Sequence, residues 1–171
     1  MRTVVVGERP RELEELIERR RALGLDLFDE VWDGEYHMNP GPAAPHGRVD
    51  NELSFLLTPR ARRAGLVGTG PFNVGRLDDF RVPDGGYHRG RPTGTFLPTA
   101  AVVVEVVSPG DETFDKFDFY AGHGVDEIVV ADPQRRLVRI WQLRDAAYAE
   151  TGRSDLLDVL ADDLGAEIDW P

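Results

Sequence analysis

The segment Thr99–Val107 (TAAVVVEVV) constrains the fold more than any other part of the sequence. A continuous run of small and β-branched apolar residues is typical of a strand that is buried on both faces of a sheet. Glu105 interrupts this run, and a carboxylate in such a position is costly unless it is paired or bound to a metal ion. We therefore expect a functional role for Glu105. Two alternatives stay open: an edge strand that lets Glu105 face water, or a buried pair with an arginine.

The remainder of the chain alternates between helical and extended patterns. Apolar residues at helical spacing predict helices over residues 10–23, 46–63 and 111–122. Pro59 falls inside the second helix and predicts a break or kink near its end. Extended patterns predict strands within residues 27–38, 65–76, 80–88, 99–107, 126–131 and 137–143. We predict one mixed α/β domain, residues 1–171, with a central mixed sheet flanked by helices. The pattern leaves the type of the segment 154–171 open.

Composition excludes several classes of protein. The chain has 31 acidic and 20 basic side chains and a net charge of −11, so a uniformly basic nucleic-acid-binding surface is excluded and any DNA contact must be local. It has no cysteine, which excludes disulfides, a thiolate nucleophile and iron–sulfur clusters. No apolar run reaches the ~20 residues of a membrane helix, and residues 1–10 lack the apolar core of a signal peptide. We expect a soluble, cytoplasmic protein with no membrane partner.

Asp84 is the predicted partner of Glu105. If the strands on either side of residues 89–98 form an antiparallel hairpin centred between Gly94 and Thr95, Asp84 lies directly opposite Glu105. Opposed side chains on paired strands have Cβ atoms ~4.5–5.5 Å apart, and two like charges there repel each other. A divalent cation between them would remove this repulsion, and two carboxylates with water and substrate oxygens suit Mg²⁺. Asp84 and Glu105 are therefore the predicted metal ligands.

Lys116 is the only lysine among the 20 basic residues of the chain. It lies early in the helix that follows the Glu105 strand, from which its amine can reach the carboxylate pair. There it could orient a water molecule or stabilise charge that develops on a phosphate. The alternative is an ordinary salt bridge from Lys116 to Glu112 or Asp115.

Other candidates carry weaker signals. Glu35 and Glu52 could add a metal ligand, although a surface position is the commoner outcome for such glutamates. His88 shares a strand face with Asp84 and could touch a phosphate. His46 follows a proline at a helix start, which favours capping or packing. The histidines show no paired spacing of the kind found in zinc sites.

Several of these segments, taken in order, resemble a known family. They are VPD at 82–84, VVVEVVSP at 102–109 and DKFDFYAGHGVDEIVVADP at 115–133, preceded by a DGE hairpin and a PxxPHG stretch. Over residues 29–143 the chain resembles the Uma-type restriction endonuclease family of the PD-(D/E)XK nuclease superfamily. The resemblance implies a restriction-endonuclease-like fold and a Mg²⁺-dependent phosphodiesterase site, with Asp84 and Glu105 as the acidic residues.

The lysine departs from the pattern of the superfamily. The usual lysine lies two residues after the acid, where this chain has Val107. The resemblance instead implies a lysine displaced into the following helix, and Lys116 with Tyr120 matches the Lys-x-x-x-Tyr pattern of the family. The turn before Lys116 is shorter than is common in the family.

These observations predict an enzyme, a metal-dependent endonuclease that uses Mg²⁺, with Mn²⁺ as a substitute. The alternatives are a non-catalytic interaction domain on the same fold and a hydrolase of small phosphodiesters. The expected partner is a nucleic acid, DNA first, and a homodimer is expected from the resemblance alone. Phosphate contacts are predicted for a local set of arginines, namely Arg60, Arg62, Arg63, Arg76, Arg81, Arg89 and Arg91.

Overall fold

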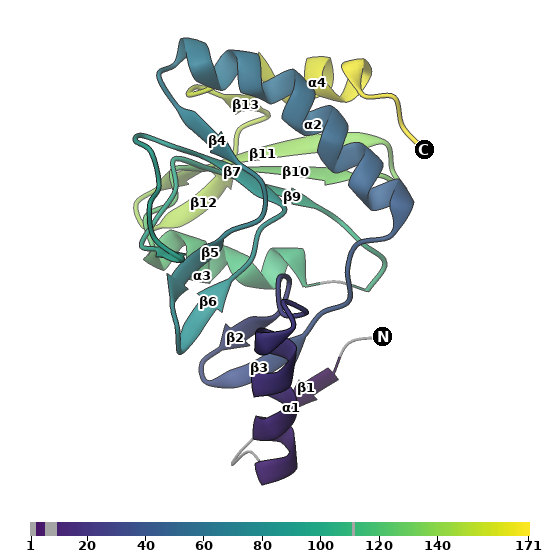
Figure 1. Cartoon of the computed structure of the whole chain (residues 1–171). Coiled ribbons are helices and arrows are strands. Elements are labelled where there is room, and N and C mark those ends of the chain that lie inside the picture. Colours follow the sequence, from purple (N-terminus) through teal and green to yellow (C-terminus); the bar gives the residue numbers. More distant parts are fainter. Residues whose placement is uncertain (1–2, 6–9, 111) are drawn as a thin grey trace.

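The computed structural model describes residues 3–5, 10–110 and 112–171 (Figure 1). In chain order its elements are β1 (Thr3–Val5), α1 (Arg11–Ala22), β2 (Glu30–Trp32), β3 (Glu35–Met38), α2 (Ala44–Arg63), β4 (Val67–Thr69), β5 (Asn73–Arg76), β6 (Asp79–Arg81), β7 (Gly85–His88), β8 (Phe96–Leu97), β9 (Val102–Val106), the 3₁₀ helix η1 (Thr113–Lys116), α3 (Phe117–Gly122), β10 (Glu127–Asp132), β11 (Leu137–Arg144), β12 (Ala147–Glu150), β13 (Arg153–Ser154), β14 (Val159–Leu160) and α4 (Ala161–Glu167).

The strands form two larger sheets where the sequence predicted one. The N-terminal sheet has the order β1-β3-β2-β6-β5-β8, and the central sheet has the order β12-β11-β10-β9-β7-β4. The predicted strand 80–88 is the point of error, because it divides into β6 of one sheet and β7 of the other. Pro83 lies at the division, and a proline has no backbone N–H to give to a strand ladder. The mixed α/β class is nevertheless correct.

β9 lies inside the central sheet, between β7 and β10. It pairs antiparallel with β7 and parallel with β10, and all five of its residues are buried. Gly85 lies opposite Val104, so the predicted register of the hairpin is confirmed, and its continuation sets Asp84 against Glu105. The edge-strand alternative for Glu105 is wrong.

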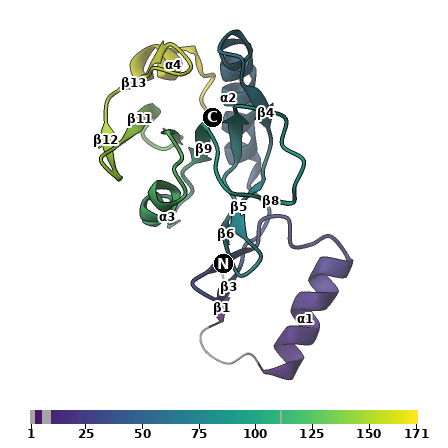
Figure 2. The same ribbon diagram turned by 90° about the vertical axis from the view of Figure 1, so that its left-hand side faces the viewer.

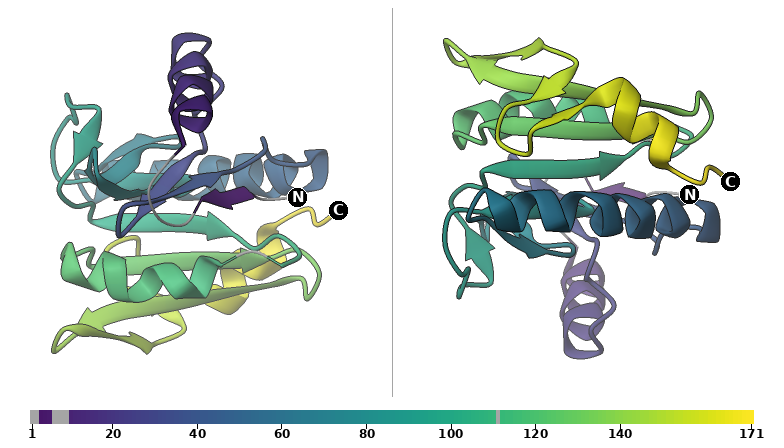
Figure 3. Two further views of the ribbon diagram at one scale, coloured as in Figure 1. Left: turned by 90° about the horizontal axis from the view of Figure 1, so that it is seen from below. Right: turned by 90° about the horizontal axis from the view of Figure 1, so that it is seen from above.

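Helices cover both faces of the central sheet. α2 and α4 lie on one side and α3 on the other (Figures 1 and 3). Val49, Leu53 and Leu57 of α2 pack against alternate residues of β9, while Val103 faces Tyr120 of α3. Because side chains alternate along a strand, Glu105 shares the α3 face with Val103. This alternation gives Glu105 its position beside η1 and α3.

The predicted helices are recovered with small changes of boundary. α1 has a single fully buried residue, Ile17, and Figure 2 shows it standing away from the central sheet. α2 continues through Pro59 to Arg63, without the predicted break. The third predicted helix is the 3₁₀ helix η1 followed by α3, and its predicted first residue, Asp111, lies outside the described residues. None of the described helices is long and apolar enough to span a bilayer.

Candidate active site

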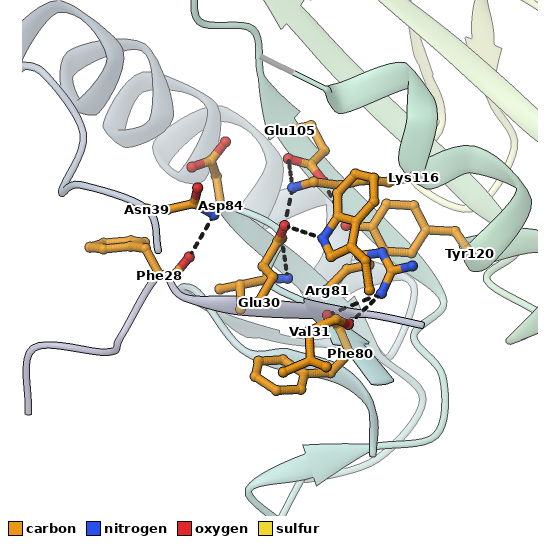
Figure 4. A network of polar contacts seen from close by, with 12 residues as sticks. Phe28, Glu30, Val31, Asn39, Phe80, Arg81, Asp84, Glu105, Lys116 and Tyr120 are labelled. Atoms are coloured by element: carbon orange, nitrogen blue, oxygen red, sulfur yellow. Dashed lines mark hydrogen bonds and ion pairs between the residues drawn. The ribbon is translucent and has the colours of Figure 1, made fainter. Parts of the chain in front are cut away.

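A cavity of about 490 Å³ lies where the N-terminal sheet meets the end of β9. We call it the site cavity. The predicted residues Asp84, Glu105 and Lys116 all line it, so three side chains that are far apart in the sequence share one space (Figure 4). Its remaining walls come from β2 and the residue two positions before it, the loop after β3, the start of α2, the residue after β6, the end of β9 and the segment that follows β9. These parts contribute Phe28, Glu30, Trp32, Asn39, Pro40, Gly41, Pro42, Ala43, His46, Val82, Val106, Ser108, Pro109, Gly110, Glu112 and Thr113.

Glu105 is almost completely buried, with 3% of its surface exposed. The Tyr120 hydroxyl donates a hydrogen bond of 2.6 Å to its Oε1. Burial raises the pKa of Glu105 to about 8, although the charge of Lys116 and the hydrogen bond from Tyr120 favour the ionised carboxylate. A carboxyl group of this kind gains from any cation that enters the cavity, because the cation compensates for the lost hydration.

Asp84 is fixed from two directions. The backbone N–H of Val106 donates to its Oδ2 at 2.8 Å, so the end of β9 holds one carboxylate oxygen. The Nε2 of His46 lies 2.8 Å from Oδ1, and since an ionised carboxylate only accepts, we assign this nitrogen as the donor. The Oγ of Ser108 lies 2.9 Å from the other ring nitrogen of His46. The carboxylate of Asp84 is therefore held in one orientation at the cavity wall.

Lys116 ends η1, and its amine lies between two buried carboxylates. Its Nζ is 3.0 Å from Oε1 of Glu30 and 3.2 Å from Oε1 of Glu105. Its side chain is only 12% exposed, and the alternative of a surface salt bridge to Glu112 or Asp115 is wrong. Burial by itself would lower the pKa of Lys116, but the charges of Glu105 and Glu30 outweigh burial and raise it. The amine is therefore a fixed positive charge inside the cavity.

Glu30 is a site residue that the sequence analysis missed. It begins β2, is 3% exposed, and its Oε1 accepts the backbone N–H of Val82 at 2.7 Å as well as facing the amine of Lys116. Its Oε2 accepts the indole N–H of Trp32 at 2.8 Å. The carboxylate thus joins β2 of the N-terminal sheet to the lysine at the end of η1. No local pattern marks it, because Glu30 and Trp32 alternate with Val31 as in a strand with one solvated face.

His46 was predicted to cap or pack at the start of α2; it makes no cap, and its largely buried ring is hydrogen-bonded to Asp84. It lies on the same helical stripe as Val49 and Leu53, a signal that indicates an inward side chain. Burial works against the charged imidazole, but its hydrogen bond with Asp84 and the nearby carboxylates outweigh burial and raise the pKa of His46. Asp50, one turn further along α2, is half-buried; burial and the charge of Asp84 raise its pKa to about 6.

The other candidates lie outside the site cavity. Glu35 and Glu52 are partly exposed and do not line it. His88 is buried against Phe72, and its Nε2 lies 3.0 Å from the hydroxyl of Thr69. These three residues are not brought together with Asp84 and Glu105.

None of the seven predicted phosphate-binding arginines lines the cavity. Arg81 is buried, with its guanidinium carbon 4.3 Å from the ring of Trp32 and 4.0 Å from that of Phe119, so its predicted contact with phosphate is wrong. Arg89 is exposed and bonds to Asp126 at 2.5 Å. Arg62, Arg63, Arg76 and Arg91 are exposed as well.

Comparison with known proteins assigns the chain to a family. The model of the Uma2 family, described as "Putative restriction endonuclease", matches residues 13–170. The chain belongs to the Uma2 family. The resemblance found over residues 29–143 is thereby confirmed and extended to nearly the whole chain.

A solved structure shows the fold independently. The crystal structure of a "putative nuclease belonging to DUF820" from Anabaena variabilis superposes with a TM-score of 0.67. It is 14% identical in sequence, and the likeness covers 82% of this chain and 90% of that one. The restriction-endonuclease-like fold is therefore correct. No curated protein matches the chain in sequence.

Proposed function

We propose that this Uma2 protein is a metal-dependent endonuclease that hydrolyses phosphodiester bonds of nucleic acid at the site cavity. One observation carries the proposal: two buried or half-buried carboxylates, Asp84 and Glu105, face one cavity together with the single lysine of the chain. The Uma2 family match and the nuclease described for the structural neighbour support the same reaction class. We treat residues 1–171 as one catalytic domain, in keeping with the family match over residues 13–170.

The donor set fits a hard divalent cation. Asp84, directly before β7, and Glu105 of β9 offer carboxylate oxygens from opposed positions, and Mg²⁺ is commonly held by one or two carboxylates together with water and substrate oxygens. The raised pKa of Glu105 marks a carboxylate that lacks a full complement of positive charge. Within residues 3–5, 10–110 and 112–171 no three His, Cys, Asp or Glu side chains form a metal-ligand set. We propose Mg²⁺, or Mn²⁺ in its place, on the Asp84–Glu105 pair, with water and substrate oxygens as the remaining ligands.

The cation, when bound, would polarise the scissile phosphate and lower the pKa of a coordinated water. Hydrolysis adds the water oxygen to phosphorus, breaks one phosphorus–oxygen ester bond, and leaves a phosphate monoester and a hydroxyl group. The amine of Lys116 is suited to orient the water or to stabilise charge on the phosphate oxygens. Glu30 holds this amine at 3.0 Å, while His46 holds the carboxylate of Asp84. Glu30 and His46 are positioning residues in this scheme.

The proposal is tested by calorimetric titration of the purified protein with Mg²⁺ and Mn²⁺, alongside a nuclease assay on plasmid and oligonucleotide DNA. We expect wild type to bind a divalent cation and the Asp84→Asn variant to bind it much more weakly with an intact fold, because an amide oxygen carries no charge. Asp78→Asn, a change at an exposed aspartate that pairs with Arg76, is the matched control. Unchanged binding in Asp84→Asn would remove Asp84 from the site.

A further inference from the structure

The reactive groups of the proposed nuclease lie inside the protein. Glu105 is buried, and the amine of Lys116 and the carboxylate of Asp84 keep only a small exposed fraction on the cavity side. A phosphodiester must therefore enter the site cavity to reach them. The cavity has the size of a small-molecule pocket, about 490 Å³. That volume accommodates a nucleotide, and an intact double helix is too wide to enter it.

The charges that line the cavity are unsuited to a duplex. Among residues 3–5, 10–110 and 112–171, four carboxylates line it, from Glu30, Asp84, Glu105 and Glu112. Its basic side chains in these ranges are Lys116 and His46, and no arginine of these ranges lines it. Double-stranded DNA carries about one negative charge per 1.7 Å of helix axis, and proteins bind it with many lysine and arginine contacts. A cavity with this balance of charge, even with a divalent cation, accepts one phosphodiester more readily than two phosphate backbones.

One wall of the cavity presents an aromatic ring. Phe28 lines the cavity, is partly exposed, and has no ring stacked on it among the described residues. In Figure 4 Phe28 lies beside Asn39, with Asp84 between it and Lys116. The amide of Asn39 donates to the Phe28 carbonyl at 2.9 Å, and the neighbouring Asp29 is buried in a salt bridge with Arg20, so the backbone here is anchored.

Trp32 offers no comparable surface. It lines the same cavity, but its ring is stacked on His37 with centroids 4.8 Å apart and is also covered by the guanidinium of Arg81. Its indole N–H is bonded to Glu30. Phe28 is therefore the ring on which an incoming base can stack.

We propose that the site cavity accepts one unpaired nucleotide, with its base against Phe28 and its phosphodiester against Asp84, Glu105 and Lys116. Single-stranded nucleic acid, or an unpaired segment of a longer duplex, is then the substrate class. This inference rests on the proposed nuclease function. Stacking on an aromatic side chain tolerates any base, because every base has a flat π-face. The inference therefore carries no sequence specificity.

The experiment compares a short single-stranded DNA oligonucleotide with its fully paired duplex in single-turnover cleavage and in fluorescence anisotropy. We expect faster cleavage and tighter binding of the single strand. Phe28→Ala should weaken binding of the single strand about tenfold, the effect of losing one base–aromatic stack. Phe28→Trp should retain it. The matched control is Phe55→Ala, which removes a phenylalanine of α2 that is 76% exposed and does not line the cavity.

Two further measurements distinguish a failure of this inference from a failure of the proposed nuclease function. Calorimetric affinity for Mn²⁺ should be the same in wild type and Phe28→Ala, which shows that the variant leaves the carboxylate pair intact. Hydrolysis of bis(para-nitrophenyl) phosphate reports the site without any nucleic acid. Cleavage of the duplex at least as fast as the single strand, or unchanged binding by Phe28→Ala, overturns the inference and leaves the nuclease function standing. Hydrolysis of the small diester alone also overturns it, and no hydrolysis of any substrate overturns the proposed function itself.

Discussion

Glu105 and Glu127 are buried glutamates on neighbouring strands of the central sheet, and their surroundings are opposite in kind. Glu105 lies near the end of β9 and Glu127 at the start of β10. Each is 3% exposed, and burial raises the pKa of each carboxyl group. Burial and a shifted pKa therefore do not distinguish the two residues. The groups that face them do.

Glu127 is surrounded by neutral donors from the C-terminal segment. Its Oε1 accepts the backbone N–H groups of Asp155 and Leu156 at 2.9 and 3.2 Å, and its Oε2 accepts the hydroxyl of Ser154. That hydroxyl in turn accepts the backbone N–H of Leu157 at 2.9 Å. The carboxylate thus fixes a turn of the chain between β13 and β14, and it does not line the site cavity.

Glu105 instead faces a lysine, a second carboxylate across the hairpin and an open cavity. Buried carboxylates that share one lysine do not make the protein more stable than apolar side chains of the same volume would. A buried acid therefore indicates function when its partners are charged and it faces an open cavity, and indicates structure when its partners are backbone amides and a hydroxyl.

The same substitution, glutamate to glutamine, should have opposite effects at Glu105 and Glu127. Glu105→Gln should lower single-turnover cleavage by about 10³-fold or more and abolish calorimetric Mg²⁺ binding, because a charged oxygen ligand is lost. Glu127→Gln should retain cleavage and metal binding but lose about 1–3 kcal/mol of unfolding free energy, since one buried donor loses its acceptor. Urea denaturation measures the second effect. Equal losses of activity in both variants would contradict the distinction.

Substitution of Lys116 removes the charged partner of Glu105. Lys116→Ala should lower the cleavage rate by ~10²-fold or more, the scale of one acid–base or electrostatic group. It should also destabilise the protein by about 3–5 kcal/mol, because Glu30 and Glu105 then remain as buried like charges without a cation.

Lys116→Arg separates the two effects. It keeps the positive charge between the carboxylates and should retain most of the stability that Lys116→Ala loses. A planar guanidinium cannot replace the compact amine, so the rate should stay nearly as low as in Lys116→Ala. Single-turnover cleavage at saturating Mg²⁺ and thermal melting measure the two quantities. Full activity in Lys116→Arg would overturn the catalytic assignment.

The helices and strands that follow from local sequence patterns could be predicted. The site residues whose position depends only on those elements could be predicted as well. Glu105 stands out in its apolar run, the hairpin register gives Asp84, and the helix after β9 gives Lys116. Glu30 could not be found in this way, because it enters the site only through the packing of the N-terminal sheet against the end of β9. The division of strands into two sheets was missed for the same reason, although Pro83 marks the point of division.

His46 provides the smallest and most specific test, because it acts through Asp84. His46→Phe removes the hydrogen bond to Oδ1 of Asp84 and the contact with Ser108, while the backbone bond from Val106 remains. Loss of a residue that orients a metal ligand typically lowers metal affinity 10–100-fold, and we expect a loss of this size for Mg²⁺ and Mn²⁺ by calorimetry.

His46→Gln, whose side-chain amide can still donate to Asp84, should recover part of the affinity. His123→Phe, at a histidine of α3's C-terminal end that does not line the cavity, is the matched control. A purely structural histidine would lower thermal stability in both His46 variants without changing metal affinity, and that result would remove His46 from the site.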